Sequence, residues 1–201
     1  MAVPSPAVEE LAHMITRSAG RGPALVSLDG PAGAGKTTLA AQLAHRLGGP
    51  RPAAVVHGDD FFRPLPWRER VAMTPRQGYS RLFTWQRLRD QVLVPLRAGR
   101  AAHYERYDPA TNSLRHDEPG HITPTGTVIV EGVLTARPEL AALYHLVVFV
   151  DTPGDVCLRR LYARGRDARR LAWITTWQAV ERHYFTTTEL RARAHLTIAH
   201  E

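Results

Sequence analysis

The sequence predicts an α/β fold in which a mainly parallel sheet is covered by helices on both faces. Strand segments alternate with helical segments along the chain, as they do in parallel sheets. A glycine-rich loop joins the first strand to a helix, and two later strands each end on a carboxylate. A chain of 201 residues is long enough to bury its own core, so we expect a single domain over residues 1–201.

Apolar spacing and glycine breaks define the N-terminal elements. Apolar residues at helical spacing predict an N-terminal helix within residues 1–20, over 6–17. A buried strand is expected over 24–28, followed by a tight glycine-rich loop. Apolar residues at helical spacing then predict an amphipathic helix over 37–47, which Gly48-Gly49-Pro50 ends.

The middle of the chain mixes short elements with an irregular segment. A second short strand over 53–57 closes on Gly58-Asp59-Asp60. Residues 61–83 contain three prolines and no clear period, so we expect a long loop on the substrate side. A helix over 84–96, capped by its first residue, and a strand over 103–107 follow.

The C-terminal half begins with a second excursion on the substrate side. Residues 108–126 are polar and rich in turn formers, which predicts a surface loop. The strongest strands are expected over 127–131 and 146–151. The remaining predicted elements are helices over 138–143, 153–164 and 171–188 and a short strand over 196–198.

Composition excludes several classes of protein. Lys36 is the only lysine among 26 basic residues, and so large a share of Arg is typical of a GC-rich genome. The net charge of +7 is therefore weak support for nucleic-acid binding. A single cysteine, Cys157, excludes an intrachain disulfide framework. Because the chain has neither a leader pattern nor an apolar run near the roughly 20 residues of a membrane span, we expect a cytoplasmic protein without membrane contact. Homo-oligomerisation is left open.

Residues 30–37 match the phosphate-binding pattern G-x-x-x-x-G-K-[ST] in full. Such a loop curls its N–H groups toward phosphate oxygens at a helix N-terminus. Lys36 would reach the β- and γ-phosphates, and the Thr37 hydroxyl would ligate Mg²⁺. The N-K-x-D segment of GTPases and the L-S-G-G signature of transporter ATPases are absent from the sequence, which favours a small-molecule kinase that uses ATP and Mg²⁺. The expected ATP-binding residues are Gly30, Ala32, Gly33, Ala34, Gly35, Lys36, Thr37 and Thr38.

Carboxylates follow three of the predicted strands. Ligands of parallel sheets bind at the carboxyl ends of the strands, so we expect Asp59, Asp60, Glu131 and Asp151 to gather with the glycine-rich loop on one rim. Neighbouring side chains at a strand end point in opposite directions, so only one of the adjacent aspartates should face the phosphates. An acid that closes an apolar strand, as Glu131 does, is costly unless it holds a metal or hydrogen-bond donors, which favours a Mg²⁺-linked role.

A run of arginines from the end of the helix predicted over 153–164 to the start of the next helix has two interpretations. It is either a solvated basic helix face or a lid over about 159–171 that brings guanidinium groups to the phosphates. We favour the lid, because Gly165 interrupts the helical pattern, and we expect Arg169 and Arg170 to stand outside its function. The six arginines are Arg159, Arg160, Arg164, Arg166, Arg169 and Arg170.

Three further features have simpler explanations. His57 at a strand end is expected to be a packed core residue rather than a ligand. Trp173, Trp177 and Tyr184 share roughly one helical face, which is typical of packing. Cys157 lies within a predicted helix and is expected to be inert.

Taken together, these motifs resemble those of uridine kinase-type proteins, in the group that includes phosphoribulokinase and pantothenate kinase. The resemblance implies a three-layer P-loop kinase fold with a small arginine-bearing lid, and transfer of the γ-phosphoryl group of Mg·ATP to a hydroxyl of a nucleoside or nucleoside-like molecule. It also implies Asp59 as general base, a metal site of Thr37, Glu131 and Asp59, and lid residues Arg160, Arg164 and Arg166. The matching segments are Gly30–Thr38, His57–Arg63, Phe83–Leu88, Tyr104–Asp108, Val130–Val133, Asp151-Thr152 and Arg164–Asp167.

The acceptor side both matches and departs from this pattern. The resemblance implies that Tyr107 stacks on the base of the acceptor. Phe62 stands where the family usually has Tyr, and Arg63 matches the last residue of the family's D-x-F-[YF]-R segment. The family usually has Phe-Asp where this chain has Phe83-Thr84, and a neutral hydroxyl replaces a carboxylate that accepts from two ribose hydroxyls.

Another departure is Asn112, which stands near the position of a base-contacting His. The alternatives are therefore a sugar, pantothenate-like or antibiotic acceptor on the same fold. A nucleotide-gated regulatory or nucleic-acid-binding protein that uses the arginine segment is a further alternative.

Overall fold

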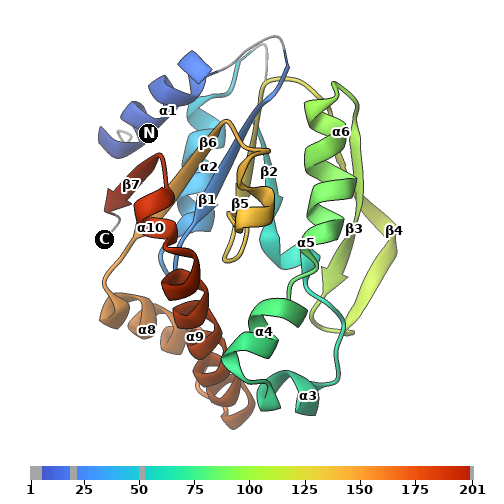
Figure 1. Cartoon of the computed structure of the whole chain (residues 1–201), viewed down its shortest axis with the longest axis vertical. Helices are drawn as coiled ribbons and strands as arrows, with labels where there is room; N and C mark the ends of the chain where they lie inside the picture. Colours follow the sequence, from blue (N-terminus) through green and yellow to red (C-terminus); the bar gives the residue numbers. More distant parts are fainter. Residues whose placement is uncertain (1–5, 19–21, 50–52, 200–201) are drawn as a thin grey trace.

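The computed structural model describes residues 6–18, 22–49 and 53–199, in which a parallel sheet lies between two layers of helices (Figure 1). The sheet of these residues has the strand order β2-β5-β1-β6-β7, and each neighbouring pair is parallel. The predicted mainly parallel sheet is thus confirmed. Its strands are β1 Ala24–Asp29, β2 Ala53–His57, β5 Thr127–Glu131, β6 Leu146–Asp151 and β7 Leu196–Ala199.

The strands are mainly apolar because each face of the sheet packs into its own hydrophobic cluster. In β1, Leu25 packs into the cluster that contains α9, whereas Val26 packs into the cluster of α1 and α2. One face is covered by α1 Pro6–Ser18, α2 Lys36–Arg46 and α8 Gly154–Ala163. The other is covered by α9 Ala168–Thr188, α7 Pro138–Ala141 and α10 Leu190–Arg193.

The helix predicted within residues 1–20 is α1, and the ends of that segment, 1–5 and 19–20, lie outside the described residues. The predicted helix over 171–188 begins earlier, at Ala168. Its N-cap is Asp167, whose carboxylate accepts the Arg170 backbone N–H at 2.9 Å. The helix therefore begins about one turn earlier than predicted, because its capping residue lies before the first apolar residue of the pattern.

The prediction of an irregular loop over 61–83 is wrong. The segment after the 3₁₀ turn η1 Gly58–Phe61 contains two helices, α3 Trp67–Ala72 and α4 Pro75–Arg81. Two of the prolines start these helices rather than break them, because Pro66 is the N-cap of α3 and Pro75 stands in the first turn of α4. Thr74 and Gln77 complete a capping box at α4, with the side chain of each accepting the backbone N–H of the other.

The prediction of a surface loop over 108–126 is also wrong, because most of it is a strand. β3 Ala102–Asp108 pairs antiparallel with β4 Ser113–Ile122, and Figure 1 shows this hairpin at the side of the molecule, next to α6. Most residues of β4 are exposed, which explains their polar character. The predicted helix over 84–96 is one continuous helical segment with a π turn in its middle: α5 Trp85–Leu88, η2 Arg89–Leu93 and α6 Val94–Arg97.

In the described part of the chain, none of the helices has the length and apolar character that crossing a bilayer requires.

Candidate active site

A cavity of about 610 Å³ opens at the carboxyl ends of β1, β2 and β5, where parallel sheets usually bind their ligands. Its lining comes from the glycine-rich loop, from the ends of β2 and β5 with the residues that follow them, and from the segment 161–177, which ends in the N-terminal half of α9. Arg70, Tyr107 and Pro109 complete it. Of the four strand ends expected on this rim, three contribute to the cavity. Asp151 is not among its lining residues and forms an ion pair with Arg191 at 2.8 Å.

The glycine-rich loop has the backbone of a phosphate cradle. Gly33 and Gly35 both have φ of +86°, a conformation that other residues rarely adopt. A Cβ at Gly33 would stand 2.6 Å from the Cys157 carbonyl oxygen, so only glycine fits against α8 at this point. The loop leads directly into α2, whose N-terminal N–H groups and dipole favour an anion.

Lys36, expected to reach the phosphates, is 6% exposed and lines the cavity. Its ammonium group donates to the carbonyl oxygens of Gly30 at 2.8 Å and Pro31 at 2.7 Å, which holds it across the loop. The expected ATP-binding residues that line the cavity are Ala32, Gly33, Gly35, Lys36, Thr37 and Thr38, while Gly30 and Ala34 are not among its lining residues.

Glu131, buried at the end of β5, is paired with two side chains of the cavity. The Thr37 hydroxyl donates to its Oε1 at 3.2 Å, and Nδ1 of His57 lies 2.7 Å from the same oxygen. The prediction that His57 is a packed core residue is wrong: its side chain is 49% exposed and lines the cavity. The hydrogen bond to Glu131 raises the pKa of His57, because the carboxylate favours the imidazolium form.

Asp59 and Asp60 both line the cavity, and the prediction that only one of them faces the phosphates stays a prediction. They belong to the turn η1 rather than to a strand, so the alternation of strand side chains does not apply. The recessed position of Asp59, and then the negative charge of Glu131, raise its pKa although the side chain stays accessible from the cavity. Partial burial also raises the pKa of Asp60, and Arg106, 3.9 Å from its carboxylate, opposes this shift.

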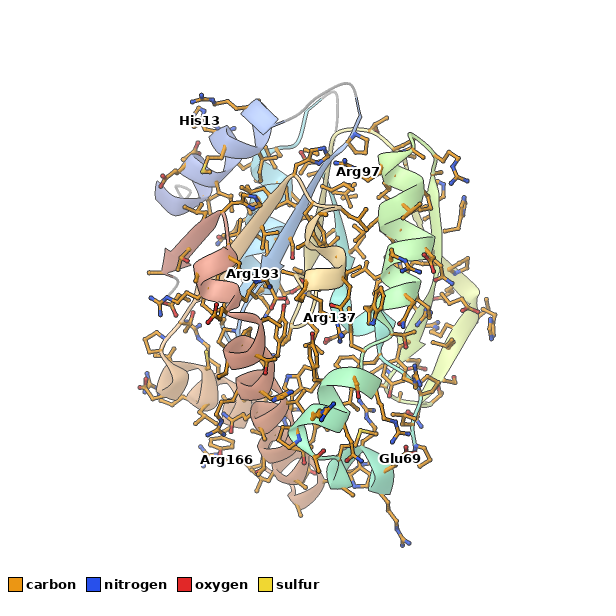
Figure 2. The ribbon with its side chains drawn as sticks, viewed as in Figure 1. His13, Glu69, Arg97, Arg137, Arg166 and Arg193 are labelled. Carbon is orange, nitrogen blue, oxygen red and sulfur yellow. The ribbon has the colours of Figure 1, made fainter. Side chains whose placement is uncertain are left out.

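The arginine segment is divided between the cavity and the surface. Arg164 and Arg170 line the cavity, so the expectation that Arg170 stands outside the site is wrong. Arg160 donates to the Gly33 carbonyl oxygen at 3.2 Å from the other side of the loop. Arg166 packs over the ring of Tyr162 at 5.7 Å, at the edge of the molecule (Figure 2). Arg169 packs over Trp67 at 4.5 Å, away from the cavity lining.

Aromatic side chains form one wall of the cavity. Phe62, Tyr107, Trp173 and Trp177 line it, and Trp177 meets the Phe62 ring edge-on at 5.2 Å. The prediction that the two tryptophans only pack is therefore incomplete, whereas Tyr184 is fully buried as expected. Arg70, which the sequence analysis missed, lies over three of these rings, 4.6 Å from the centre of Trp173.

Four residues expected to contact the acceptor are not among those that line the cavity. Phe83 is buried, Thr84 is half-buried, and the exposed Arg63 joins the fold through its backbone N–H. Asn112 is exposed and positions Tyr107, because its Oδ1 accepts the phenol proton at 2.9 Å.

Cys157 is buried, and burial raises the pKa of its thiol, consistent with the inert role expected. Across residues 6–18, 22–49 and 53–199, no group of three or more His, Cys, Asp or Glu side chains has the arrangement of a metal site.

The fold and the cavity together define a small-molecule kinase of the P-loop type. The chain belongs to the phosphoribulokinase/uridine kinase family, whose model matches residues 25–186. It is 25% identical over 166 residues to the uridine kinase of Ureaplasma parvum, covering 79% of this chain and 78% of that one. The uridine kinase of Deinococcus deserti is 29% identical over 153 residues, covering 72% of each chain.

The fold is also that of a solved structure described as a possible uridine kinase from Bacillus stearothermophilus. The TM-score is 0.72 at 22% identity, over 95% of this chain and 96% of that one. This likeness supports the three-layer arrangement.

Proposed function

We propose that the protein transfers the γ-phosphoryl group of Mg·ATP to a hydroxyl group of a nucleoside or nucleoside-like small molecule, with Asp59 as the general base. One observation carries the proposal: Asp59 shares a cavity with the buried ammonium of Lys36 and with the aromatic wall of Phe62 and Tyr107. A carboxylate between a phosphate cradle and an acceptor wall is what transfer to an alcohol requires.

The residues of the loop suit a nucleoside triphosphate and its metal. The N-terminal amides of α2 and the Lys36 ammonium offer donors and positive charge to the β- and γ-phosphates. Thr37 and Glu131 place two oxygen atoms 3.2 Å apart, with Asp59 in the same cavity. Oxygen ligands suit Mg²⁺, which takes few protein ligands and keeps water and phosphate oxygens for the rest. When bound, Mg²⁺ would offset the negative charge of the phosphates.

The chain's own residues would supply the proton acceptor and the positive charge. Asp59 accepts the proton of the attacking hydroxyl, and its raised pKa makes it a stronger base than an ordinary carboxylate. Arg160, Arg164 and Arg166 form the lid in this proposal, and the position of Arg170 in the cavity adds it to them. Guanidinium groups held over the moving phosphoryl group stabilise the charge that spreads over its oxygens.

The aromatic wall supports a planar acceptor. Phe62 and Tyr107, whose ring centres lie 6.2 Å apart, can contact a flat ring by stacking or edge-on packing. The second candidate is a non-nucleoside acceptor such as a sugar, a pantothenate-like molecule or an antibiotic. The sequence motivates it, because Thr84 offers no carboxylate for a ribose diol, but Thr84 is not among the residues that line the cavity.

The test is mass-spectrometric detection of phosphorylated products with Mg·ATP and a panel of uridine, cytidine, modified nucleosides, sugars and pantothenate. We expect a product 80 Da heavier than a nucleoside or nucleoside-like acceptor, the mass added by one phosphoryl group. Products from only the sugars or pantothenate would replace the nucleoside proposal with the second candidate. Release of ADP without any phosphorylated product would contradict both.

A further inference from the structure

One backbone amide of the P-loop points to helix α9 rather than to the cradle. The N–H of Ala32 donates to Oε1 of Glu181 at 2.8 Å. Glu181 is 6% exposed and comes from the middle of α9, 149 residues away in sequence. This hydrogen bond therefore attaches the first half of the loop to α9, the helix whose N-terminal half also lines the cavity.

Glu181 is an unusual residue for this position. No Lys, Arg or His of the described residues lies within salt-bridge distance of it, and burial raises its pKa to about 7, against the opposing charge of Lys36. Burial of a carboxylate costs free energy unless its hydrogen bonds compensate for the lost hydration. An apolar residue would fill the same space at a lower cost in free energy, so the hydrogen bond that Glu181 accepts from the P-loop is the reason to look for a function.

Glu181 also lies one turn from a residue of the aromatic wall. Trp177 precedes it by one turn on α9, and its indole lowers the pKa of the Glu181 carboxyl. The Trp177 ring lines the cavity, stacks on Trp173 at 5.4 Å and meets Phe62 edge-on. Helix α9 thus carries both a residue of the aromatic wall and the carboxylate that holds the phosphate-binding loop.

We propose that Glu181 is a positioning residue that fixes the P-loop through Ala32 and links it, through the adjacent turn of α9 that carries Trp177, to the aromatic wall of the cavity. An acceptor that contacts Trp177 contacts the helical turn next to the residue that holds the loop, so the donor and acceptor sites are coupled through α9. The inference rests on the proposed function only in taking the loop as the ATP site.

The loop half of the link is tested with Glu181→Met, which keeps the length of the side chain without an oxygen, and Glu181→Gln, which keeps an acceptor oxygen without the charge. Loss of one hydrogen bond predicts Mg·ATP binding about fivefold weaker in Glu181→Met, measured by calorimetry, with faster deuterium exchange of the peptide that contains Ala32. Glu181→Gln should restore both to wild-type values.

Thr188→Val is the matched control, because Thr188 is buried on the same helix and its hydroxyl bonds only the helix carbonyl of Tyr184, at 2.8 Å. It should leave Mg·ATP binding and loop exchange unchanged. Wild-type behaviour of Glu181→Met, or equal weakening by Met and Gln, would overturn the positioning role. A wild-type protein that binds no Mg·ATP would instead contradict the proposed function.

The acceptor half is tested with Trp177→Phe, which keeps an aromatic ring against Phe62 and removes the indole N–H. We expect Mg·ATP binding to weaken about twofold, and to weaken no further when the substitution is added to Glu181→Met. If the fold-changes in Mg·ATP affinity of the two substitutions multiply in the double variant, the two residues act independently. That result, or an unchanged affinity in Trp177→Phe alone, would show that Trp177 does not take part in the link.

Discussion

The phenol of Tyr184 donates a 2.9 Å hydrogen bond to Oδ2 of Asp29, which joins α9 to the last residue of β1. Both side chains are fully buried. Asp29 also accepts the backbone N–H of Gly30 at 2.7 Å and that of Ala136 at 2.8 Å. One carboxylate therefore ties together the start of the P-loop, the segment after β5 and the helix that carries the aromatic wall.

Tyr184→Phe should lower the free energy of unfolding by about 1.5–3 kcal/mol, because it removes a hydrogen bond from a buried acidic group and adds no replacement. Urea denaturation monitored by circular dichroism measures the change. Tyr79→Phe is the control, since Tyr79 stacks on Tyr184 at 5.8 Å but is only half-buried. Equal losses in the two variants would show that the bond to Asp29 contributes nothing specific.

The raised pKa of Glu181, about 7 in the folded chain against an ordinary value of 4.5, predicts a pH-dependent stability. Between these values the unfolded chain releases a proton that the folded chain keeps, so rising pH favours unfolding. Glu181→Gln removes this titrating group. The unfolding free energy of the variant minus that of the wild type should therefore rise by about 3 kcal/mol from pH 4.5 to 7 and then level off. Urea titrations across that range measure the difference, and a constant difference would mean that the pKa is not raised.

Asp59→Asn should lower kcat by about 100-fold or more, because the hydroxyl proton then has no carboxylate to accept it, while Mg·ATP binding stays within a few fold. Asp60→Asn is the matched control from the adjacent position in the same cavity. It should affect kcat far less, since Asp60 faces Arg106. Undiminished turnover in Asp59→Asn would exclude the general-base role.

Local sequence signals were sufficient for the elements that position the phosphate cradle. Residues 30–37 carry the whole spacing of the loop, and the apolar runs at 127–131 and 146–151 mark buried strands without knowledge of their partners. β4 escaped prediction because it is exposed and polar and exists through its pairing with β3. The helix α4 could have been found from Thr74-Pro75-Arg76-Gln77, which is a capping box with a proline in the first turn.

The aromatic wall of the cavity depends on tertiary contacts that the spacing of residues in the sequence does not reveal. Arg70 stands in a segment expected to be a loop, and Trp173 looks like a packing residue of its helix. They meet because α3 packs on the N-terminal part of α9, as Figure 1 shows. Glu181 meets the P-loop through tertiary structure as well, because α9 packs into the hydrophobic cluster that contacts Ala32, and no sequence motif connects these two segments.

Arg164→Gln and Arg170→Gln should each lower kcat by about tenfold or more with a smaller effect on the KM of ATP, because a lid arginine acts mainly on the transition-state charge. Arg169→Gln is the control from the same segment, since Arg169 packs on Trp67 outside the cavity lining. Steady-state kinetics with the acceptor phosphorylated fastest in the panel measure all three. Equal, small effects at the three positions would favour the solvated basic face instead of a lid.

Arg70 is expected to set the fit of the acceptor rather than the chemistry. Its guanidinium lies over the rings of Phe62, Tyr107 and Trp173, and its Nη1 donates to the Tyr107 hydroxyl at 2.7 Å. Its buried Nε has no hydrogen-bond partner among the described residues. An ammonium cannot reproduce this planar stacking, so Arg70→Lys should raise the acceptor KM about tenfold with kcat and Mg·ATP affinity nearly unchanged. The exposed Arg63→Lys serves as control, and a loss confined to kcat in Arg70→Lys would assign Arg70 to phosphoryl transfer instead.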